Sequence, residues 1–430
     1  MNPATLETPR RRVPIVFDPE YCRKPGVAPL GPIRVGADNE AALAVVRDYL
    51  GVNWRKMARA PKGVLKQPYL VPGAVYDNLW DWDAFFTACA IPDQGLEFAV
   101  GSIRNFLDNV REDGRPPKMT SPEGALNYTS QPIPLQAQFL YLMARRTPDF
   151  AWAEPYWPIL ERIRAWYDRE TMAPGPFYIW LGFQGNGIDN NPSVYGRPPR
   201  SSAGVDLACW HYRELRALAK LAARFNRNDG DQWAERAADL AQRIARHYWD
   251  ALDEFFYNLD CSADPGQTSL QGVTWETFLK FRNWASFFPL WAGVATSGQA
   301  AALIRRALDP AEFLAPGGLR SHSAREPIYN NTATGNPSNW QGPVWGLSTF
   351  LTAYGLANYG YRAEALDLAF RQIRVLAADI EQNSCLHEYY HGDTSQPIMK
   401  PGFLSWDLLA LRVIADLRAG ADGTTGDLLT

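Results

Sequence analysis

Helical periodicity is the feature of this 430-residue chain that most restricts its fold. Apolar residues recur at three- and four-residue spacing in about a dozen stretches, which is the pattern of α-helices. Twelve such helices would pair into six hairpins. Their approximate cores are residues 39–50, 79–91, 94–112, 132–146, 150–171, 204–226, 230–249, 278–293, 298–308, 342–359, 361–380 and 402–419.

The predicted helices are of two kinds. FLKFRNWASFFPLWAGV and GPVWGLSTFLTAYGLA are apolar nearly all round, as buried helices are. YRAEALDLAFRQIRVLAADI and DQWAERAADLAQRIARHYW carry one charged face, as outer helices do. We therefore predict an all-α fold, an (α/α)6 barrel built as a six-hairpin toroid. A solenoid of helix pairs would alternate similarly, but no fixed-period repeat supports it.

Long and short connections alternate between these helices. Segments rich in Gly, Pro, Asn and Ser cover residues 113–131, 172–203, 250–277, 309–341 and 381–401. We expect these functional loops to lie on one face of the barrel. The predicted organisation is an extended, Pro-rich arm over residues 1–35, a catalytic barrel domain over 36–420 and a tail over 421–430.

Charge and composition restrict the partners. The formal charge of -3 leaves no basic face for a nucleic acid. The chain has no apolar run of signal-peptide or membrane length, so we expect a cytoplasmic protein that does not bind membranes. Its five cysteines are far apart and lack a CxxC pair, so we interpret them as reduced core thiols. We predict no metal and no cofactor, and a homo-oligomer is compatible with the sequence.

Aromatic residues are unusually concentrated in polar segments. The chain has 16 Trp, 19 Tyr and 20 Phe, with clusters such as DNLWDWD, SNWQGPVW and PFYIWLGF. Aromatic faces pack on the C–H faces of sugar rings, while carboxylates and amides bond the hydroxyls. For any single tryptophan, core packing is the simpler interpretation. The coincidence of aromatic and polar residues indicates a carbohydrate pocket.

The segment HEYYH, which begins at His387, matches the zinc-protease pattern HExxH. That pattern requires a helix and a further ligand downstream. Asn383-Ser384 and the Gly392–Pro397 stretch leave little room for a helix, and no His or Glu follows His391. We instead predict that Glu388 lies on a short extended segment, aimed into a cavity, where it could deprotonate a water molecule.

A second carboxylate candidate is Asp189 in GNGIDNNP. Taken alone, this segment reads as a tight turn. It follows an aromatic run, however, and precedes a helix that begins near Gly204. A carboxyl group placed against aromatic rings has a raised pKa and can remain protonated, so it can donate to a leaving oxygen.

Two tryptophan-rich segments stand at helix starts. Trp80 and Asp83 are three residues apart, so they would share a helical face and could hold one sugar ring, with Asp81 and Trp82 pointing elsewhere. The segment NWQGPVW, residues 339–345, sets aromatics around an amide. Core packing of its tryptophans is an equal alternative.

Five segments, in this order, resemble glycoside hydrolase family sixty-three and the related trehalases: DNLWDWDAFF, QPIPLQAQF, GNGIDNNPS, NWQGPVWG and HEYYHGDTSQP…GFLSW. The closest likeness is to small bacterial glucosylglycerate and mannosylglycerate hydrolases, and it runs from about Tyr76 to Trp406.

The resemblance implies an (α/α)6 barrel and inversion at the anomeric carbon, with Asp189 as general acid and Glu388 as general base. It also implies that the sugar pocket contains Tyr76, Trp80, Trp82, Asp83, Tyr128, Gln131, Trp340, Gln341 and Trp345. The chain departs from the family pattern at two places. Larger relatives carry Arg where this chain has Gln341, and the usual Thr-Gly-Glu after the base is replaced by residues 393–396, DTSQ.

The predicted substrate is a small α-glycoside such as glucosylglycerate or mannosylglycerate. The carboxylate of a glyceric acid needs a cation or several donors. Arg197, in a loop at 195–202 that could act as a lid, is the candidate, although it could equally be a solvated loop charge.

Three alternatives stay open. The enzyme could be an α-glucosidase or trehalase acting on α-disaccharides. It could be a sugar epimerase or isomerase, but such enzymes use paired histidines, and the five histidines here are scattered. It could also be a non-catalytic sugar-binding toroid.

Overall fold

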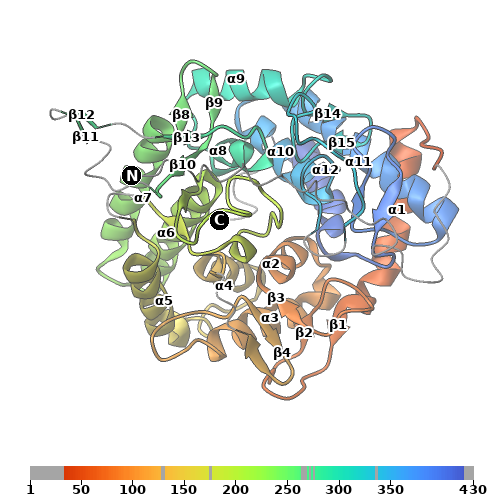
Figure 1. Cartoon of the computed structure of the whole chain (residues 1–430). Helices are drawn as coiled ribbons and strands as arrows, with labels where there is room; N and C mark the ends of the chain where they lie inside the picture. The colour runs from red at the N-terminus through yellow and green to blue at the C-terminus, as the bar shows by residue number, and fades with distance from the viewer. Residues whose placement is uncertain are drawn as a thin grey trace, which may run out of the picture.

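The computed structural model describes residues 33–126, 131–173, 177–262, 269–270, 273–274, 277–334 and 338–420. Within these ranges it contains twelve α-helices, at positions close to the predicted ones. Figure 1 shows them as two concentric layers around a common axis.

The even-numbered helices form the inner layer. Each contacts the next along the chain, and the last contacts the first, which closes the ring. They are α2 (Asp81–Ala90), α4 (Gln136–Arg146), α6 (Val205–Arg224), α8 (Phe288–Ala292), α10 (Gly346–Asn358) and α12 (Leu409–Ala419). The predicted (α/α)6 barrel is therefore confirmed.

The odd-numbered helices cover the outside of this ring (Figure 1). They are α1 (Asn39–Asn53), α3 (Leu96–Asp108), α5 (Trp157–Glu170), α7 (Gly230–His247), α9 (Ser297–Ala307) and α11 (Arg362–Asn383). The predicted alternation holds. Residues 346–356 of α10 are all buried, whereas α7 buries only Ala237, Leu240 and Ile244.

The strands all lie in the connections that lead from an outer helix to the next inner helix. They form small antiparallel sheets within the described ranges. They are β1 (Ala58–Arg59), β2 (Tyr69–Leu70), β3 (Leu79–Trp80), β4 (Met119–Ser121), β5 (Gly124–Leu126), β6 (Ile179–Trp180), β7 (Ser202–Ala203), β8 (Trp249–Asp250), β9 (Phe255–Phe256), β10 (Asn258–Asp260), β11 (Ser269–Leu270), β12 (Val273–Thr274), β13 (Phe278–Leu279), β14 (Leu314–Ala315), β15 (Gly318–Leu319), β16 (Tyr389–Tyr390) and β17 (Pro397–Met399).

These long connections meet at the N-terminal ends of the inner helices, because the helices of each hairpin are antiparallel. The connections on the other face are short, for example residues 91–95 between α2 and α3, or 359–361 between α10 and α11. The expectation of long loops on one face is thus confirmed.

Three helix predictions were clearly too long. For the first, α5 begins at Trp157 rather than at residue 150, after a 3-10 helix over Glu154–Tyr156. Residues 278–293 form β13, a 3-10 helix at Trp284–Phe287 and the short α8. Pro289 lies in the first turn of α8, since proline lacks an N–H and is tolerated only at a helix start. Likewise α12 begins at Leu409 rather than at residue 402, after a 3-10 helix over Ser405–Leu408.

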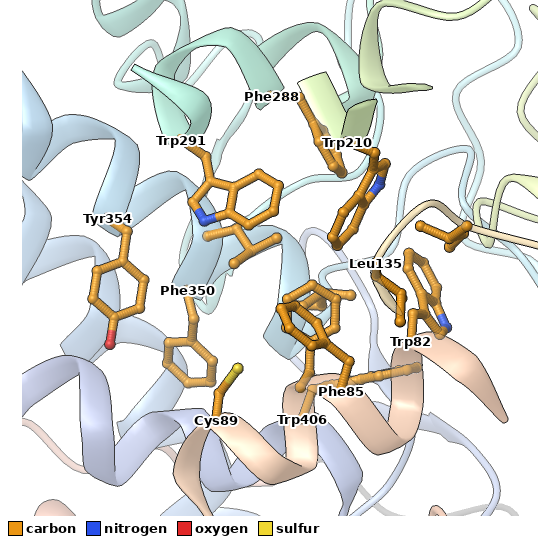
Figure 2. Close-up of a cluster of buried hydrophobic side chains, with 14 of the residues drawn as sticks. Trp82, Phe85, Cys89, Leu135, Trp210, Phe288, Trp291, Phe350, Tyr354 and Trp406 are labelled. Carbon is orange, nitrogen blue, oxygen red and sulfur yellow. The ribbon is translucent and has the colours of Figure 1, made fainter. Parts of the chain in front are cut away.

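Aromatic side chains fill the barrel axis. Figure 2 shows rings from α2, α6, α8 and α10 turned toward one another. Phe85 and Trp291 both contact Trp210, with ring centroids 6.0 and 5.0 Å away. At the loop end of the barrel, Trp82 meets Trp406 at 5.9 Å.

Four of the five cysteines lie in the described part and are free: Cys89 and Cys209 are buried, whereas Cys261 and Cys385 are only partly so, which corrects their interpretation as core thiols. The predicted boundaries of the arm, barrel and tail stay predictions. Residues 1–32 and 421–430 lie outside the described ranges.

Candidate active site

A cavity of about 450 Å³ opens where the long loops meet the inner helices. It combines acids, amides and aromatic rings from segments far apart in the chain. The described residues that line it are Pro72, Tyr76, Asn78, Trp80, Asp81, Trp82, Asp83, Lys118, Gly187, Asp189, Ser338, Trp340, Trp345, Glu388, Lys400, Phe403 and Trp406.

The start of α2 forms one wall. Asp81 accepts hydrogen bonds from the backbone N–H groups of Trp82, at 2.7 Å, and Ile133, at 3.0 Å. Its Oδ1 also pairs with the Nζ of Lys118 at 3.0 Å. Both partners are buried. Acidic groups are favoured at this helix end, because the helix dipole is positive there.

Asp83 lies two residues after Asp81 and is 9% exposed. Burial raises its pKa to about 7, and the nearby carboxyl groups of Glu388 and Asp81 raise it as well, against a lowering effect of Lys118. A carboxyl with a raised pKa donates a hydrogen bond when protonated and accepts one when ionised, which suits recognition of a sugar hydroxyl.

The loop that carries Asp189 forms a second wall. Gly187 has a φ of +78° and lies so close to Trp82 that a Cβ atom would come within 2.5 Å of its ring. Only glycine satisfies both conditions. Trp82 and the loop are thereby packed together without a gap, which places the Asp189 carboxyl at the cavity.

Amide groups connect this loop to the segment 338–341. Ser338 N donates to Asp189 Oδ2 at 3.2 Å, and Trp340 N donates to Asn190 Oδ1 at 2.6 Å. Gln341 Nε2 donates to the carbonyl of Asn190 at 3.0 Å. The GNGIDNNP and NWQGPVW motifs, 150 residues apart, thus form one hydrogen-bonded unit around the candidate acid.

Glu388 lies just before β16, on a hairpin formed with β17. Its N–H donates to the carbonyl of Met399 at 2.8 Å. Its side chain is 8% exposed, and its Oε2 has no hydrogen-bond partner among the described residues. The nearest cation is Lys400, whose Nζ is 3.6 Å from that oxygen.

The residues that flank Glu388 are held by helix α11. His387 Nδ1 lies 2.8 Å from Asp379 Oδ2, and the hydroxyl of Tyr390 donates to the same oxygen at 2.8 Å. His387, Tyr390 and Asp379 are all buried. The HEYYH motif is therefore a segment of extended backbone anchored to α11. It does not form the helical metal site of the HExxH pattern that it matches.

Burial raises the pKa of both candidate catalytic carboxyls. For Glu388 the value is about 7, with Lys400 lowering it and Asp189 raising it. The pKa of Asp189 is also raised by burial, and the hydrogen bond from Ser338 opposes that effect. Lys400 lowers the pKa of both carboxyls, and among the described residues it is in ion-pair contact with Glu388 but not with Asp189.

Stacked aromatic rings complete the cavity wall. Trp340 and Trp345 are parallel within 4°, with centroids 3.9 Å apart. Trp284 extends the stack behind Trp340 at 5.5 Å, and Tyr389 extends it beyond Trp345 at 4.4 Å. Because the faces of Trp340 and Trp345 are covered by neighbouring rings, the stack gives the cavity a rigid, apolar wall formed by the edges of these two rings.

Most of the predicted site residues are brought together by the fold. Eight line the cavity: Tyr76, Trp80, Trp82, Asp83, Asp189, Trp340, Trp345 and Glu388. Gln341 is not in the lining and instead supports the Asp189 loop. Gln131 is buried outside the lining, with its Oε1 accepting from Leu181 N at 3.2 Å.

Two further predicted residues are not in the described lining. Arg197 forms an ion pair with Asp260 at 2.8 Å, so its charge is already partnered. Tyr128 lies outside the described residues. The placement of Asp81 and Trp82 away from Trp80 was wrong, because α2 begins only at Asp81. Trp80 is still in β3, so the helical spacing did not apply.

Sequence reasoning missed Lys118, Lys400 and Trp406 as cavity residues. An isolated lysine in a loop belongs to no recognisable pattern. Trp406 was part of the GFLSW segment and carried some signal. Its Nε1, like the hydroxyl of Tyr76, is buried without a hydrogen-bond partner among the described residues. Buried polar atoms are normally satisfied, so these atoms are suited to bind ligand hydroxyls.

The family model described as the mannosylglycerate hydrolase MGH1-like glycoside hydrolase domain matches residues 76–406. The chain belongs to this glycoside hydrolase family. The match confirms the resemblance noted from the motifs, and it covers all of the described residues that line the cavity except Pro72.

Curated relatives of this MGH1-like chain include trehalases. It is 30% identical to the "Probable trehalase" of Eremothecium gossypii, over 75% of this chain and 52% of that protein. It is 20% identical to the "Periplasmic trehalase" of Escherichia coli, over 81% of this chain and 69% of that one. The chain thus spans about half the length of the first relative.

Solved structures share the fold of the MGH1-like chain. The GH63 mannosylglycerate hydrolase from Thermus thermophilus, in complex with Tris and D-glycerate, matches with a TM-score of 0.63 at 18% identity, over 87% of this chain and 100% of that chain. The neutral trehalase from Saccharomyces cerevisiae matches with a TM-score of 0.61 at 18% identity, over 84% of this chain and 76% of that chain.

The described ranges contain no helix with the length and apolar character needed to cross a bilayer. They also contain no group of three or more His, Cys, Asp and Glu side chains placed to hold a metal ion.

Proposed function

We propose that this protein is an inverting hydrolase of small α-glycosides, with Asp189 as general acid and Glu388 as general base. Asp189 would protonate the glycosidic oxygen, and Glu388 would deprotonate a water molecule that attacks the opposite face of the sugar ring. The observation that carries the proposal is that Asp189 and Glu388, two of the three described lining carboxyls with raised pKa values, come from different loops and line one aromatic cavity, while the third, Asp83, lies at the start of α2.

The environments of the two groups support their assignment. A general base must be ionised before it accepts a proton, and Lys400 favours that form of Glu388. A general acid must start protonated, and burial favours that form of Asp189. The Oε2 of Glu388, which accepts no hydrogen bond from the described residues, is an acceptor available to a water molecule.

The proposed substrates are α-mannosylglycerate and α-glucosylglycerate. The name of the matched family and the D-glycerate complex of the Thermus thermophilus structure support this choice. Neutral α-disaccharides such as trehalose are a second candidate, supported by the trehalase names of the curated relatives. An epimerase is less well supported, because no histidine is among the described residues that line the cavity. A cytoplasmic location stays a prediction.

Proton NMR of the released sugar tests the proposal. The purified chain is incubated with each glycerate glycoside and with trehalose, and the anomeric signal is followed from the first turnovers. We expect the β-anomer to appear first. An α-anomer appearing first would contradict inversion, and no cleavage of any substrate would contradict a hydrolase of these sugars.

Variants test the roles of the two carboxyls. Asp189→Asn and Glu388→Gln should each lower kcat by about 10²–10⁴-fold, the usual contribution of general acid–base catalysis. Glu381→Gln and Asp231→Asn are matched controls, because both side chains are exposed on outer helices. Activity in either active-site variant equal to that of its control would refute that role.

A further inference from the structure

The hairpin β16–β17 places a lysine directly beside the candidate base. Tyr389 pairs with Met399 in this hairpin, and the N–H of Glu388 donates to the carbonyl of Met399. The residue after Met399 is therefore held next to Glu388. That residue is Lys400, whose Nζ reaches to 3.6 Å from Glu388 Oε2.

The other charged groups near Glu388 would not stabilise its negative charge. Lys118, the second lysine among the described lining residues, is paired with Asp81 at 3.0 Å. The remaining ionisable neighbours are acids. They are Tyr76 and Asp83 on either side of β3, Asp189 on its loop, Tyr389 on β16 and Asp407 before α12.

The backbone and a ring hold Lys400 in place. Its φ is +51°, in the left-handed region that residues with a Cβ atom adopt at a cost in free energy. The end of the β16–β17 hairpin imposes this conformation, which fixes the backbone of Lys400 beside Glu388. Its ammonium also lies 5.5 Å from the centre of the Tyr76 ring, a cation–π contact that directs it into the cavity.

We propose that Lys400 is a positioning residue that keeps Glu388 ionised and oriented to act as a base. The proposal rests on the proposed function, in which Glu388 is the general base. The lysine acts through the carboxylate: it supplies the only counter-charge in ion-pair contact with Glu388 among the described residues. It also leaves the carboxylate free to accept a proton from water, because 3.6 Å is longer than a normal hydrogen bond.

The pH profile of kcat/KM tests this role. Lys400→Met removes the charge and keeps the length of the side chain. We expect the low-pH limb of the kcat/KM profile to lie about one pH unit higher in Lys400→Met than in the wild type. The reason is that a buried carboxylate loses a partly exposed cation that favours its ionised form. Lys400→Arg should restore the limb. Lys62→Met, an exposed lysine outside the described lining, is the charge-matched control. An unmoved limb in Lys400→Met would overturn the proposal.

A glycine variant separates charge from backbone. Lys400→Gly relieves the left-handed strain, so we expect a higher melting temperature together with the same limb shift as in Lys400→Met. If the limb moved in Lys400→Met but not in Lys400→Gly, the effect would belong to the hairpin conformation, and the charge role would fall.

Direct titration removes the dependence on turnover. Full-length protein labelled with ¹³C at the glutamate side-chain carboxyl carbon is titrated by NMR, with Glu388→Gln used to assign the signal. The midpoint should rise in Lys400→Met, and no rise would overturn the proposal. If the wild-type chain cleaved no α-glycoside, the proposed function would fall, while this midpoint would still decide whether Lys400 stabilises the charge of Glu388.

Discussion

Removal of Lys118 should destabilise the whole barrel through Asp81. The side chains of this pair are 6% and 1% exposed, so Lys118→Met leaves a buried carboxylate without its counter-ion. Breaking a buried ion pair costs about 3–5 kcal/mol. Two backbone N–H groups still bond Asp81, so we expect the lower end, about 3 kcal/mol.

The shift in melting temperature follows from the size of the chain. At about 2.1 cal/mol/K per residue, 430 residues give an unfolding entropy of roughly 0.9 kcal/mol/K. A loss of about 3 kcal/mol therefore lowers the Tm by only about 3 °C. Differential scanning calorimetry resolves this, with agreement of calorimetric and van't Hoff enthalpies as the condition for the conversion.

A double-mutant cycle separates the ion pair from simple loss of packing. Asp81→Asn with Lys118→Met should be less destabilised than the sum of the single changes, by about 2 kcal/mol. Lys62→Met, an exposed lysine, should change stability by less than about 0.5 kcal/mol. Additivity of the two changes, or a loss below about 1 kcal/mol in Lys118→Met, would refute the reasoning.

Three further predictions concern pH and packing. The wild-type kcat/KM should fall about tenfold per unit below pH 7, because burial raises the pKa of Glu388 to about 7 and a base must be ionised; a flat profile from pH 5 to 7 would contradict this. Gly187→Ala should lower kcat/KM at least about tenfold, because its Cβ would displace the ring of Trp82, whereas Gly36→Ala, in open space, should have no effect; equal rates would refute it. Burial raises the pKa of Asp407 well above its usual value, so its protonated form favours folding at low pH and that contribution is lost as the pH rises. Asp407→Asn removes this loss, because asparagine does not ionise. Urea unfolding should therefore show that the variant gains more free energy of unfolding over the wild type at pH 8 than at pH 5. Equal gains at the two pH values would contradict this.

The helical layers of the barrel could be predicted because burial imposes a period on the sequence. The charged face of α7 indicates the outer layer, and the mostly apolar sequence of α10 indicates the inner layer. The helix starts were harder, since they depend on local backbone chemistry. Pro289 confines α8 to a few residues, and periodicity alone extends a helix through it.

Site residues could be predicted where they belong to a local sequence motif. They could not be predicted where only the fold brings them to the cavity. Asp189 and Glu388 were found because each lies in an unusual local segment. Lys118 and Lys400 were not found, because their roles depend on contacts that only the folded chain creates. Lys118, for example, forms an ion pair with Asp81, 37 residues earlier in the sequence. Arg197 was expected at the cavity from the composition of its loop. Composition contains no information about its ion-pair partner, Asp260, which lies on β10.

The stacked rings of Trp340 and Trp345 should also give the cavity wall a circular dichroism signal of its own. Two parallel indoles with centroids 3.9 Å apart couple their strong electronic transitions, which should give this protein a paired band in far-ultraviolet circular dichroism. Both rings line the cavity. A sugar that contacts their edges changes the polarity around the coupled pair, so ligand binding can be followed without any label, even in variants that no longer turn over.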